Sequence, residues 1–542
     1  MNKKAFLIVL CITGIYLFST TRSSLWDRDE PRFTRAVVEM LESGSYLVPT
    51  FNGEVWPDKP PLLYWIMSVP IRLLGPTEFA CRFFGVIGSG LACVLTFFIG
   101  RRLLGKEAGL WAMVILASNL LMLFVGSAAT SDAVLLPFNV AAIAIFALSI
   151  GSKMRLSHAV AIGCILGLAM LTKGPIGLMP LPAIAAILWF DRKTRTNFWR
   201  DGLLMGVSLI IGFLIFAAWA IPANISTDGE FLRVFVGRHI INRALRPMEN
   251  HGGNFLLYLP YYLPVIIVGF FPWTLHLPGA ISAVSGGRIG GKNGRILLLS
   301  WIVPAFIIMS LAATKLPHYI LFIWPAIALA VAGLITAQQD SLTVRDKIWL
   351  RRGTWFFGSI AIPMGLGLVI GPWFLRMPGL YWSGTTAGVI LLVMAVLAIR
   401  YQESNRPQFS TKVLLVCMLV FEIPVLFGIL PAIEKIKISP EIAAAVNAGT
   451  DKDVPVAAYK YREPTLNFYI GRKIESLGTQ EEVAAWAKRP GPGVLIIPQS
   501  KLDEVQQNYG DLGLDKIASK NGYNYSKGKT LEVVALIRKI DK

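Results

Sequence analysis

A polar segment at residues 25–64 carries several ionisable side chains between two apolar stretches of the chain. Asp29 and Asp58 supply carboxylates, whereas Arg32 and Lys59 supply fixed cations. A carboxylate can take a proton from an acceptor hydroxyl, and Lys or Arg can neutralise the charge that develops on a departing phosphate. The composition of this segment therefore suits the transfer of a group from a phosphate-linked donor to a hydroxyl.

The amino-acid composition indicates an integral membrane protein. Hydrophobic residues make up 54% of the 542 residues and charged ones only 16%, which is too apolar for an ordinary soluble protein. The net charge of +19 does not indicate a nucleic-acid partner, because the Lys and Arg residues cluster in short gaps between apolar runs. The five cysteines fall in or beside apolar runs without paired spacing, so we expect neither a disulfide framework nor a zinc site.

The apolar runs predict a polytopic α-helical fold with about 13 transmembrane helices, at roughly 20 residues per span. The first run fits either a cleaved signal peptide or an uncleaved anchor, and the lack of an A-x-A cleavage site favours the anchor. The predicted spans are residues 5–18, 84–100, 108–127, 133–150, 157–172, 175–190, 202–221, 261–283, 296–311, 319–336, 354–375, 384–400 and 412–431.

The positive charges of the gaps predict how the spans are oriented. Every second gap is rich in Lys and Arg, as at residues 101–106, and belongs in the cytoplasm together with the N-terminus. The remaining gaps share the opposite face, which is the periplasm in a diderm bacterium. They contain residues 25–64, Asp132, Lys173 and residues 314–319. Ionisable residues at a membrane are by default functional candidates.

A change in composition near residue 433 predicts two domains. Residues 1–432 form the membrane domain, and residues 433–542 form a small periplasmic α/β domain. Strands are predicted in the second domain at residues 454–459, 493–498 and 531–537, and helices at residues 480–488 and 501–509. Amphipathic helices lying in the membrane interface are predicted at residues 32–43, 60–74 and 233–246.

Each charged residue also has a purely structural explanation. Asp29 could be an acidic residue in the first turn of a helix, Asp132 a helix cap and Lys173 a snorkelling anchor. Such roles would scatter the charges, whereas the predicted topology gathers them on one face. Because that face lacks ATP, the phosphate would belong to a lipid. This is the logic of a glycosyltransferase that uses a polyprenyl-phosphate sugar.

Five short motifs occur in order along the membrane part: LWDRDEPRF at 25–33, KPPLLYW at 59–65, ATSD at 129–132, LTKGP at 171–175 and TKLPHYIL at 314–321. Together they resemble the aminoarabinose lipid A transferase group, glycosyltransferase family 83. This group belongs to the GT-C superfamily, which also includes the protein O-mannosyltransferases. The resemblance covers residues 5 to about 335. Two positions depart from it: Phe33 stands where the group has Tyr, and residues 58–64 are closer to a general bacterial pattern.

The resemblance implies roles for individual residues. Asp29 and Asp132 match the carboxylates to which catalysis is attributed. Asp58 falls at a position linked to a divalent metal ion, with His239 or His251 as its partner. The residues implied in binding the substrates are Arg32, Lys59, Lys173, Arg243, Arg246, Lys315, His318 and Tyr319.

The implied function is that of an inverting enzyme that transfers a pentosyl or hexosyl group. The donor would be a sugar linked to undecaprenyl phosphate or to a similar polyprenyl phosphate, and the enzyme would lie in the inner membrane of a bacterium. Lipid A is the leading acceptor, and its phosphates would suit the arginines at residues 233–246, which could equally bind anionic lipid headgroups. Protein Ser or Thr, or another envelope glycan, is an alternative acceptor. A transporter of lipid-linked sugars is a more distant alternative. Such a protein would carry charges near the membrane midplane and inverted repeats, whereas here the charges lie in the predicted external loops and the sequence shows no repeat.

Overall fold

The computed structural model describes residues 3–150, 153–191, 197–242, 245, 255–337, 342–524 and 527–538, with the backbone alone at residues 3–5 and 255. The chain divides into two compact units. The first unit consists of Met1–Thr20, Pro57–Ile66 and Arg82–Ile429, and the second of Thr21–Trp56, Met67–Cys81 and Leu430–Lys542. The predicted fold class, a polytopic helical protein with a small C-terminal α/β part, is confirmed.

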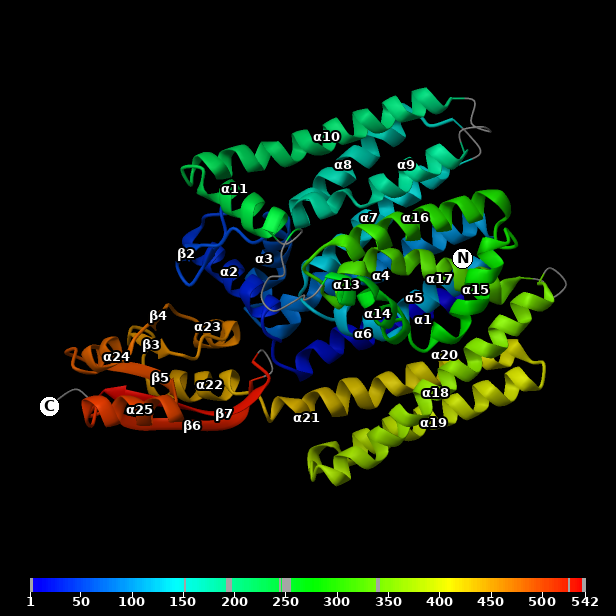
Figure 1. The fold of residues 1–542 in the computed structure, drawn as a ribbon. Helices are drawn as coiled ribbons and strands as arrows, with labels where there is room; N and C mark the ends of the chain where they lie inside the picture. The colour runs from blue at the N-terminus through cyan, green and yellow to red at the C-terminus, as the bar shows by residue number, and fades with distance from the viewer. Residues whose placement is uncertain are drawn as a thin grey trace. The chain divides into compact units, whose positions relative to one another are not determined.

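Helices make up the described part of the first unit (Figure 1). Helices α3 and α4 each begin or end in the other unit. The α-helices are α1 (Lys3–Ser19), α3 (Leu62–Leu74), α4 (Glu78–Leu103), α5 (Lys106–Ala117), α6 (Leu120–Val125), α7 (Ser131–Leu148), α8 (Leu156–Lys173), α9 (Pro180–Asp191), α10 (Phe198–Ile225), α11 (Glu230–Val234), α13 (Phe255–Tyr258), α14 (Tyr262–Gly269), α15 (Leu277–Ser285), α16 (Gly291–Leu311), α17 (Trp324–Thr336), α18 (Val344–Phe374), α19 (Tyr381–Glu403) and α20 (Pro407–Pro424). Short 3-10 or π segments join them at η2 (Gly174–Leu178), η3 (Phe235–Asn242), η4 (Leu259–Tyr261), η5 (Trp273–His276), η6 (Pro317–Ile323), η8 (Pro378–Leu380) and η9 (Val425–Ile429).

Helix occurs at every one of the predicted spans. Nine helices among the described residues are long and apolar enough to cross a membrane. A tenth span results if Leu256–Gly269 and Trp273–Ser285, which are bent by 114° relative to each other, count as one. The predicted spans at residues 5–18 and 175–190 correspond to shorter apolar helices, Phe6–Arg22 and Pro180–Asp191.

The predicted span at residues 108–127 is interrupted between α5 and α6. The Asn119 side chain accepts a hydrogen bond from the backbone N–H of Met122 (3.1 Å) and so caps α6. Its Oδ1 also accepts a hydrogen bond from the Trp324 indole (3.0 Å). Asn competes with helix propagation by bonding nearby backbone groups. Because the apolar periodicity continues through the break, hydropathy alone does not reveal it.

Glycine residues allow α10 to pack closely against α8. A Cβ atom at Gly163 would lie 2.8 Å from the Ser208 carbonyl oxygen, and one at Gly167 would lie 2.7 Å from Cβ of Ile215. Residues four apart share a helix face, so these two glycines form one contact strip. Figure 1 shows α10 running beside α8. This packing fixes the course of α8, whose last residue is Lys173.

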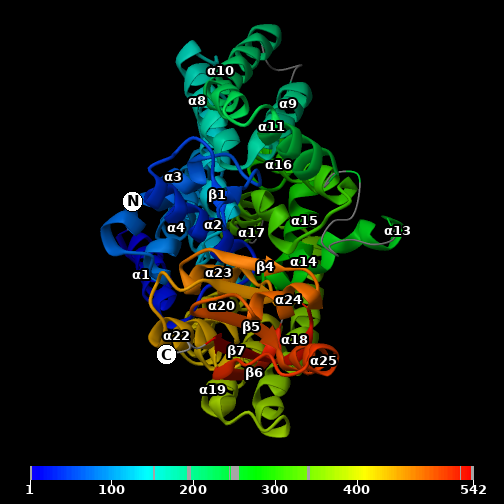
Figure 2. The ribbon, with the colours of Figure 1, turned by 90° about the vertical axis from the view of Figure 1, so that its left-hand side faces the viewer.

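A five-stranded sheet forms the centre of the C-terminal part of the second unit (Figure 2). The strand order is β4-β3-β5-β7-β6; β3 pairs in parallel with β4 and β5, whereas β7 pairs antiparallel with β5 and β6. The strands are β3 (Val456–Tyr459), β4 (Ile474–Leu477), β5 (Gly493–Pro498), β6 (Asp515–Asn524) and β7 (Lys529–Arg538). The helices are α21 (Leu430–Glu434), α22 (Ser439–Gly449), α23 (Pro464–Ile470), α24 (Gln480–Ala487) and α25 (Gln499–Tyr509).

The two faces of this sheet are covered by different helices. Ile442 of α22 and Leu466 of α23 pack with Val494 on one face. Trp486 of α24 and Val505 of α25 form the apolar cluster of the other. The result is an α/β/α sandwich, and the strands and helices predicted for this region are confirmed. Strands β4 and β6 were not predicted, because β4 has four residues and β6, at the edge of the sheet, is mostly polar with half of its residues exposed.

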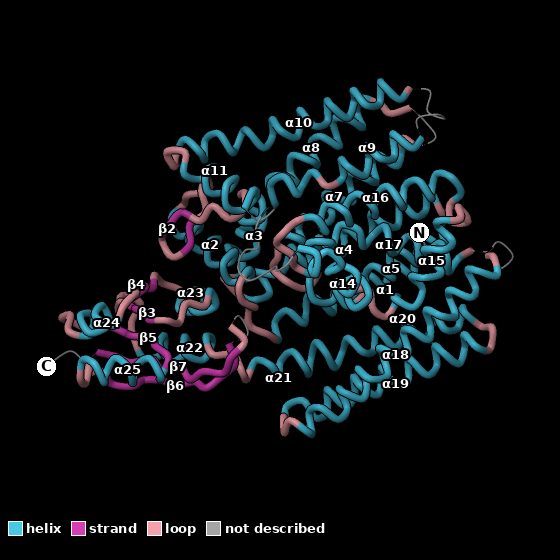
Figure 3. The backbone as a smooth tube through the Cα atoms, viewed as in Figure 1, coloured by secondary structure: helices cyan, strands magenta, loops and turns pink. Residues whose placement is uncertain are grey.

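The first polar loop contributes its own helix and hairpin to the second unit. The predicted amphipathic helix at residues 32–43 is α2 (Asp29–Ser43), which begins three residues earlier than predicted. A short antiparallel hairpin follows, made of β1 (Thr50–Phe51) and β2 (Glu54–Val55). Figure 3 shows that the strands of the described chain, in magenta, are β1, β2 and those of the C-terminal sheet.

Candidate active site

A buried ion pair joins the ends of two helices in the first unit. Asp132 lies in the first turn of α7, two residues after the N-cap Thr130. Lys173 is the last residue of α8, and its Nζ lies 2.7 Å and 2.6 Å from the two carboxylate oxygens of Asp132. A role in the first turn of α7 alone does not account for Asp132, because a cation from another helix binds both of its carboxylate oxygens.

The segment η6 adds an imidazole and an aromatic ring to this pair. His318 Nε2 lies 3.6 Å from Oδ2 of Asp132, and the Lys173 ammonium lies 4.6 Å from the ring centroid of Tyr319. A cation at that distance is attracted by the negative face of the ring. Four residues that the sequence predicted separately, from three motifs, thus form one cluster.

A second ion pair precedes α3. Lys59 Nζ lies 2.9 Å from Oδ2 of Asp58, and both side chains are buried. His239, in the π-helical segment η3, approaches the other oxygen of this carboxylate, with Nδ1 2.9 Å from Oδ1. Those two atoms do not meet in hydrogen-bond geometry. Lys59 also lies close enough to Asp132 to act on it electrostatically, which links the two ion pairs.

Lys315 occupies a different environment from the other predicted cations. Its Nζ donates hydrogen bonds to the carbonyl oxygens of Ser310 and Ala312, each at 2.5 Å, where α16 ends. It also lies 5.9 Å from the ring centroid of Tyr262. Burial lowers the pKa of the Lys315 ammonium, while the two carbonyls stabilise its charged form. The geometry is that of a helix C-cap.

Asp29 and Arg32 belong to the second unit, in the first turn of α2. Within the described part of the chain, the Asp29 carboxylate makes neither a hydrogen bond nor an ion pair. Its neighbour Glu30 is buried and accepts a hydrogen bond from the Trp26 N–H (2.8 Å), so it stabilises the loop. The Arg32 guanidinium lies 5.4 Å from the ring centroid of Trp56. Trp56 is not among the predicted site residues, although an aromatic residue in the same polar segment was a usable signal.

Three of the predicted site residues, Arg243, Arg246 and His251, lie outside the described residues. The metal site predicted at Asp58 is described only through its contact with His239. No group of three or more His, Cys, Asp or Glu side chains suited to a metal ion occurs in the ranges that the structure describes.

Comparisons with known proteins agree with this helical architecture. The family model for dolichyl-phosphate-mannose-protein mannosyltransferase matches residues 58–221. A crystal structure of ArnT from Cupriavidus metallidurans bound to undecaprenyl phosphate superimposes with a TM-score of 0.79, covering 99% of this chain and 98% of that one. At 18% identity this likeness concerns the fold. The chain is a multi-pass membrane glycosyltransferase of the GT-C type.

The curated relatives narrow the class to one family. An undecaprenyl phosphate-alpha-4-amino-4-deoxy-L-arabinose arabinosyl transferase of Erwinia tasmaniensis is 31% identical over 403 residues, which cover 73% of this chain and 70% of that protein. The enzyme of the same name from Edwardsiella ictaluri is 29% identical over 401 residues, covering 72% and 69%. The chain belongs to this arabinosyl transferase family, which confirms the resemblance found in the sequence.

Proposed function

We propose that the protein transfers 4-amino-4-deoxy-L-arabinose from undecaprenyl phosphate to lipid A. The donor is the one that the names of its relatives specify. The observation that carries the proposal is the cluster of Lys59 and Lys173 with Asp132, His318 and Tyr319. These residues combine fixed cations with hydrogen-bonding groups in a buried setting, which suits a phosphate leaving group.

In this proposal Lys59 and Lys173 hold the phosphate and stabilise the charge that it gains. Each ammonium has three donors, and each is already oriented by a carboxylate, Asp58 or Asp132. A fixed orientation before the reaction is what makes electrostatic stabilisation effective. Asp132 therefore orients Lys173 and does not act as a free base. Tyr319 and His318 limit the movement of the Lys173–Asp132 pair from the η6 side.

Asp29 is the proposed base or acceptor-orienting group. Its carboxylate makes no contact with the described residues that would consume its lone pairs, and its motif resembles that of the family. The acceptor oxygen would form a bond to the anomeric carbon while the bond from that carbon to the phosphate oxygen breaks. The acceptor proton passes to Asp29, and the configuration at the anomeric carbon inverts. Arg32 is assigned to the phosphate.

Asp58 and His239 are proposed to hold a divalent metal ion. Carboxylate oxygen and imidazole nitrogen are common zinc ligands. The facing atoms, Oδ1 and Nδ1, are buried and 2.9 Å apart without being aligned as a hydrogen bond, which fits two ligands of a shared ion. When bound, such an ion would add positive charge beside Lys59. His251 is the proposed alternative partner.

The proposed setting is the inner membrane of a bacterium, with the site and the C-terminal part facing the periplasm. The arginines predicted to meet the acceptor, Arg243 and Arg246, would then face the phosphates of lipid A or of neighbouring lipids. A protein hydroxyl or another envelope glycan is the second candidate acceptor, favoured by the match to the protein mannosyltransferase family.

Purified enzyme in lipid nanodiscs, supplied with undecaprenyl-phosphate aminoarabinose, would test the proposal. Lipid A should gain the mass of one aminoarabinose, measured by mass spectrometry, and the Asp29→Asn variant should yield none. If the sugar is transferred to a Ser- or Thr-containing peptide and lipid A stays unchanged, the acceptor is a protein hydroxyl and not lipid A. Movement of the donor across vesicles without any transfer would overturn the enzyme assignment.

A further inference from the structure

The carboxylate of Asp27, two residues before Asp29, accepts two hydrogen bonds from one residue far away in the sequence. Its Oδ1 accepts a hydrogen bond from the backbone N–H of Thr465 (2.7 Å), and its Oδ2 accepts one from the Thr465 hydroxyl (2.6 Å). Thr465 is buried at the start of α23, in the C-terminal part of the same unit. Both carboxylate oxygens of Asp27 therefore accept hydrogen bonds from the C-terminal part.

The residues just before Asp27 are held in the same way. The Lys437 ammonium donates hydrogen bonds to the carbonyl oxygen (3.1 Å) and hydroxyl (2.9 Å) of Ser24 and lies 3.8 Å from the ring centroid of Trp26. The Leu25 N–H donates to the phenol oxygen of Tyr469 (2.8 Å). Four consecutive residues, 24–27, thus each contact a side chain of the C-terminal part.

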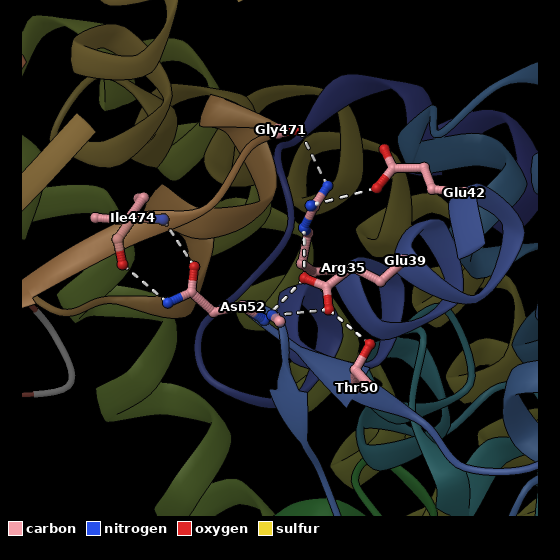
Figure 4. A network of polar contacts seen from close by, with 8 residues as sticks. Arg35, Glu39, Glu42, Thr50, Asn52, Gly471 and Ile474 are labelled. Atoms are coloured by element: carbon pink, nitrogen blue, oxygen red, sulfur yellow. Dashed lines mark hydrogen bonds and ion pairs between the residues drawn. The ribbon is translucent and has the colours of Figure 1, made fainter. Parts of the chain in front are cut away.

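The far side of helix α2 is attached as well (Figure 4). The Arg35 guanidinium donates to the Gly471 carbonyl oxygen (3.1 Å). The Asn52 side chain forms a reciprocal pair with the backbone of Ile474, donating at 2.9 Å and accepting at 2.8 Å. Glu39 joins these attachments, because it accepts hydrogen bonds from Arg35 (2.9 Å) and the Asn52 N–H (2.8 Å). Helix α2 is thereby attached to the C-terminal part through residues 24–27, which precede it, and through Arg35 and Asn52.

We propose that Thr465 is a positioning residue for catalysis, through which the C-terminal part fixes residues 24–27 and so the orientation of the first turn of α2, which carries Asp29. The inference rests on the proposed role of Asp29. Simple attachment of the C-terminal part would not require contacts at each residue leading up to the base, nor both oxygens of a carboxylate to be fixed. A misplacement of a catalytic group by about 1 Å can lower the rate by roughly a hundredfold. The bonds at Asp27 act against such a displacement.

The test compares Thr465→Val, which removes the hydroxyl and keeps the shape and the N–H, with Thr465→Ser, which restores the hydroxyl. In the nanodisc assay, kcat of Thr465→Val should fall about tenfold. A base that is only partly misplaced should lose part of the roughly hundredfold rate effect of a displacement of about 1 Å. The KM values for donor and lipid A should stay within about twofold, because Lys59 and Lys173, which hold the phosphate, are unchanged. Thr465→Ser should recover most of kcat.

Thr450→Val is the matched control. Its hydroxyl donates to the Val446 carbonyl oxygen (2.7 Å) and accepts from Arg472 (2.8 Å), both inside the C-terminal part. The same substitution there should leave kcat unchanged. Equal losses of kcat in Thr450→Val and Thr465→Val would overturn the proposal, because they would reflect the stability of the domain. Wild-type kcat in Thr465→Val would overturn it directly.

A double-mutant cycle keeps the test decisive if Thr465→Val is unstable. In an Asp27→Asn background, adding Thr465→Val should lower kcat by less than about twofold, because the bond to the carboxylate is already weakened. Fully additive losses would contradict the coupling. The proposed function is tested separately by Asp29→Asn. An inactive Asp29→Asn with a normal Thr465→Val rejects the positioning role alone, whereas an active Asp29→Asn rejects the base on which it rests.

Discussion

The ammonium nitrogen of Lys173 lies within 2.7 Å of both carboxylate oxygens of Asp132, and both side chains are buried. The two residues come from the end of α8 and the start of α7. Because both charged groups are buried, each compensates the charge of the other. This relationship predicts that both residues are needed, although only Lys173 is assigned to the phosphate.

Replacing Lys173 by Met should destabilise the protein and abolish transfer. Removing one partner of a buried ion pair leaves an uncompensated charge and costs about 3 to 5 kcal/mol. The Lys173→Met/Asp132→Asn double variant should regain most of the lost thermal stability but no activity. Melting temperature and product mass would be measured together. Lys516→Met, at an exposed position of β6, serves as the control. A Lys173→Met protein that melts like wild type would contradict the pairing.

Neutralising Lys59 should abolish most transfer. Lys59→Gln keeps a polar side chain but removes the charge that we assign to the leaving phosphate. Loss of one preorganised group of this kind lowers kcat by about 100-fold or more. The measurement is the initial rate of lipid A modification, with Lys106→Gln, at an exposed helix end, as the control. Normal rates in Lys59→Gln would remove Lys59 from the site.

Loss of His239 should reduce metal binding. His239→Ala removes one of the two ligands proposed for the ion, so the purified protein should retain less than about a tenth of the wild-type metal. Metal content would be measured by inductively coupled plasma mass spectrometry, and chelator sensitivity by the transfer assay. The control is His158→Ala, because the His158 imidazole lies in the first turn of α8. This variant should keep its metal. Equal metal contents in the two variants would reject Asp58 and His239 as ligands.

Lys315→Met should affect stability more than substrate binding. The variant loses two hydrogen bonds from a charged group to the last turn of α16, each worth about 1.5 to 3 kcal/mol. The melting temperature should drop, while the KM for the donor should stay near the wild-type value. A large rise in that KM without a change in melting temperature would support the substrate-binding role predicted from the motif.

The elements that carry local signals could be predicted from the sequence. Hydropathy indicated helix at all the spans, and the motifs identified Asp132, Lys173 and residues 318–319 before any contact between them was known. The alternation of basic gaps predicts that these residues share one face of the membrane, and this prediction gave a reason to expect them close together. The interfacial position of α2 stays a prediction.

Other features depend on contacts that leave no local pattern. The break at Asn119 needs a cap and a partner, Trp324, that lies 205 residues away. The cap formed by Lys315 resembles a binding lysine in every respect that sequence records. Thr465 lies 438 residues from Asp27, in a helix of seven residues that was not predicted. Long-range hydrogen bonds of this kind follow from the tertiary fold, not from periodicity.

The attachment of residues 24–27 by the C-terminal part has a consequence for biosynthesis. The ribosome makes Asp27 early and Thr465 438 residues later. At about 5 to 20 residues per second, that interval is roughly 20 to 90 seconds. A nascent or truncated chain can thus insert its first helices while residues 24–27 still lack these hydrogen-bond partners. On the proposed role of Thr465, full transfer activity then requires that the C-terminal part has been made and has folded.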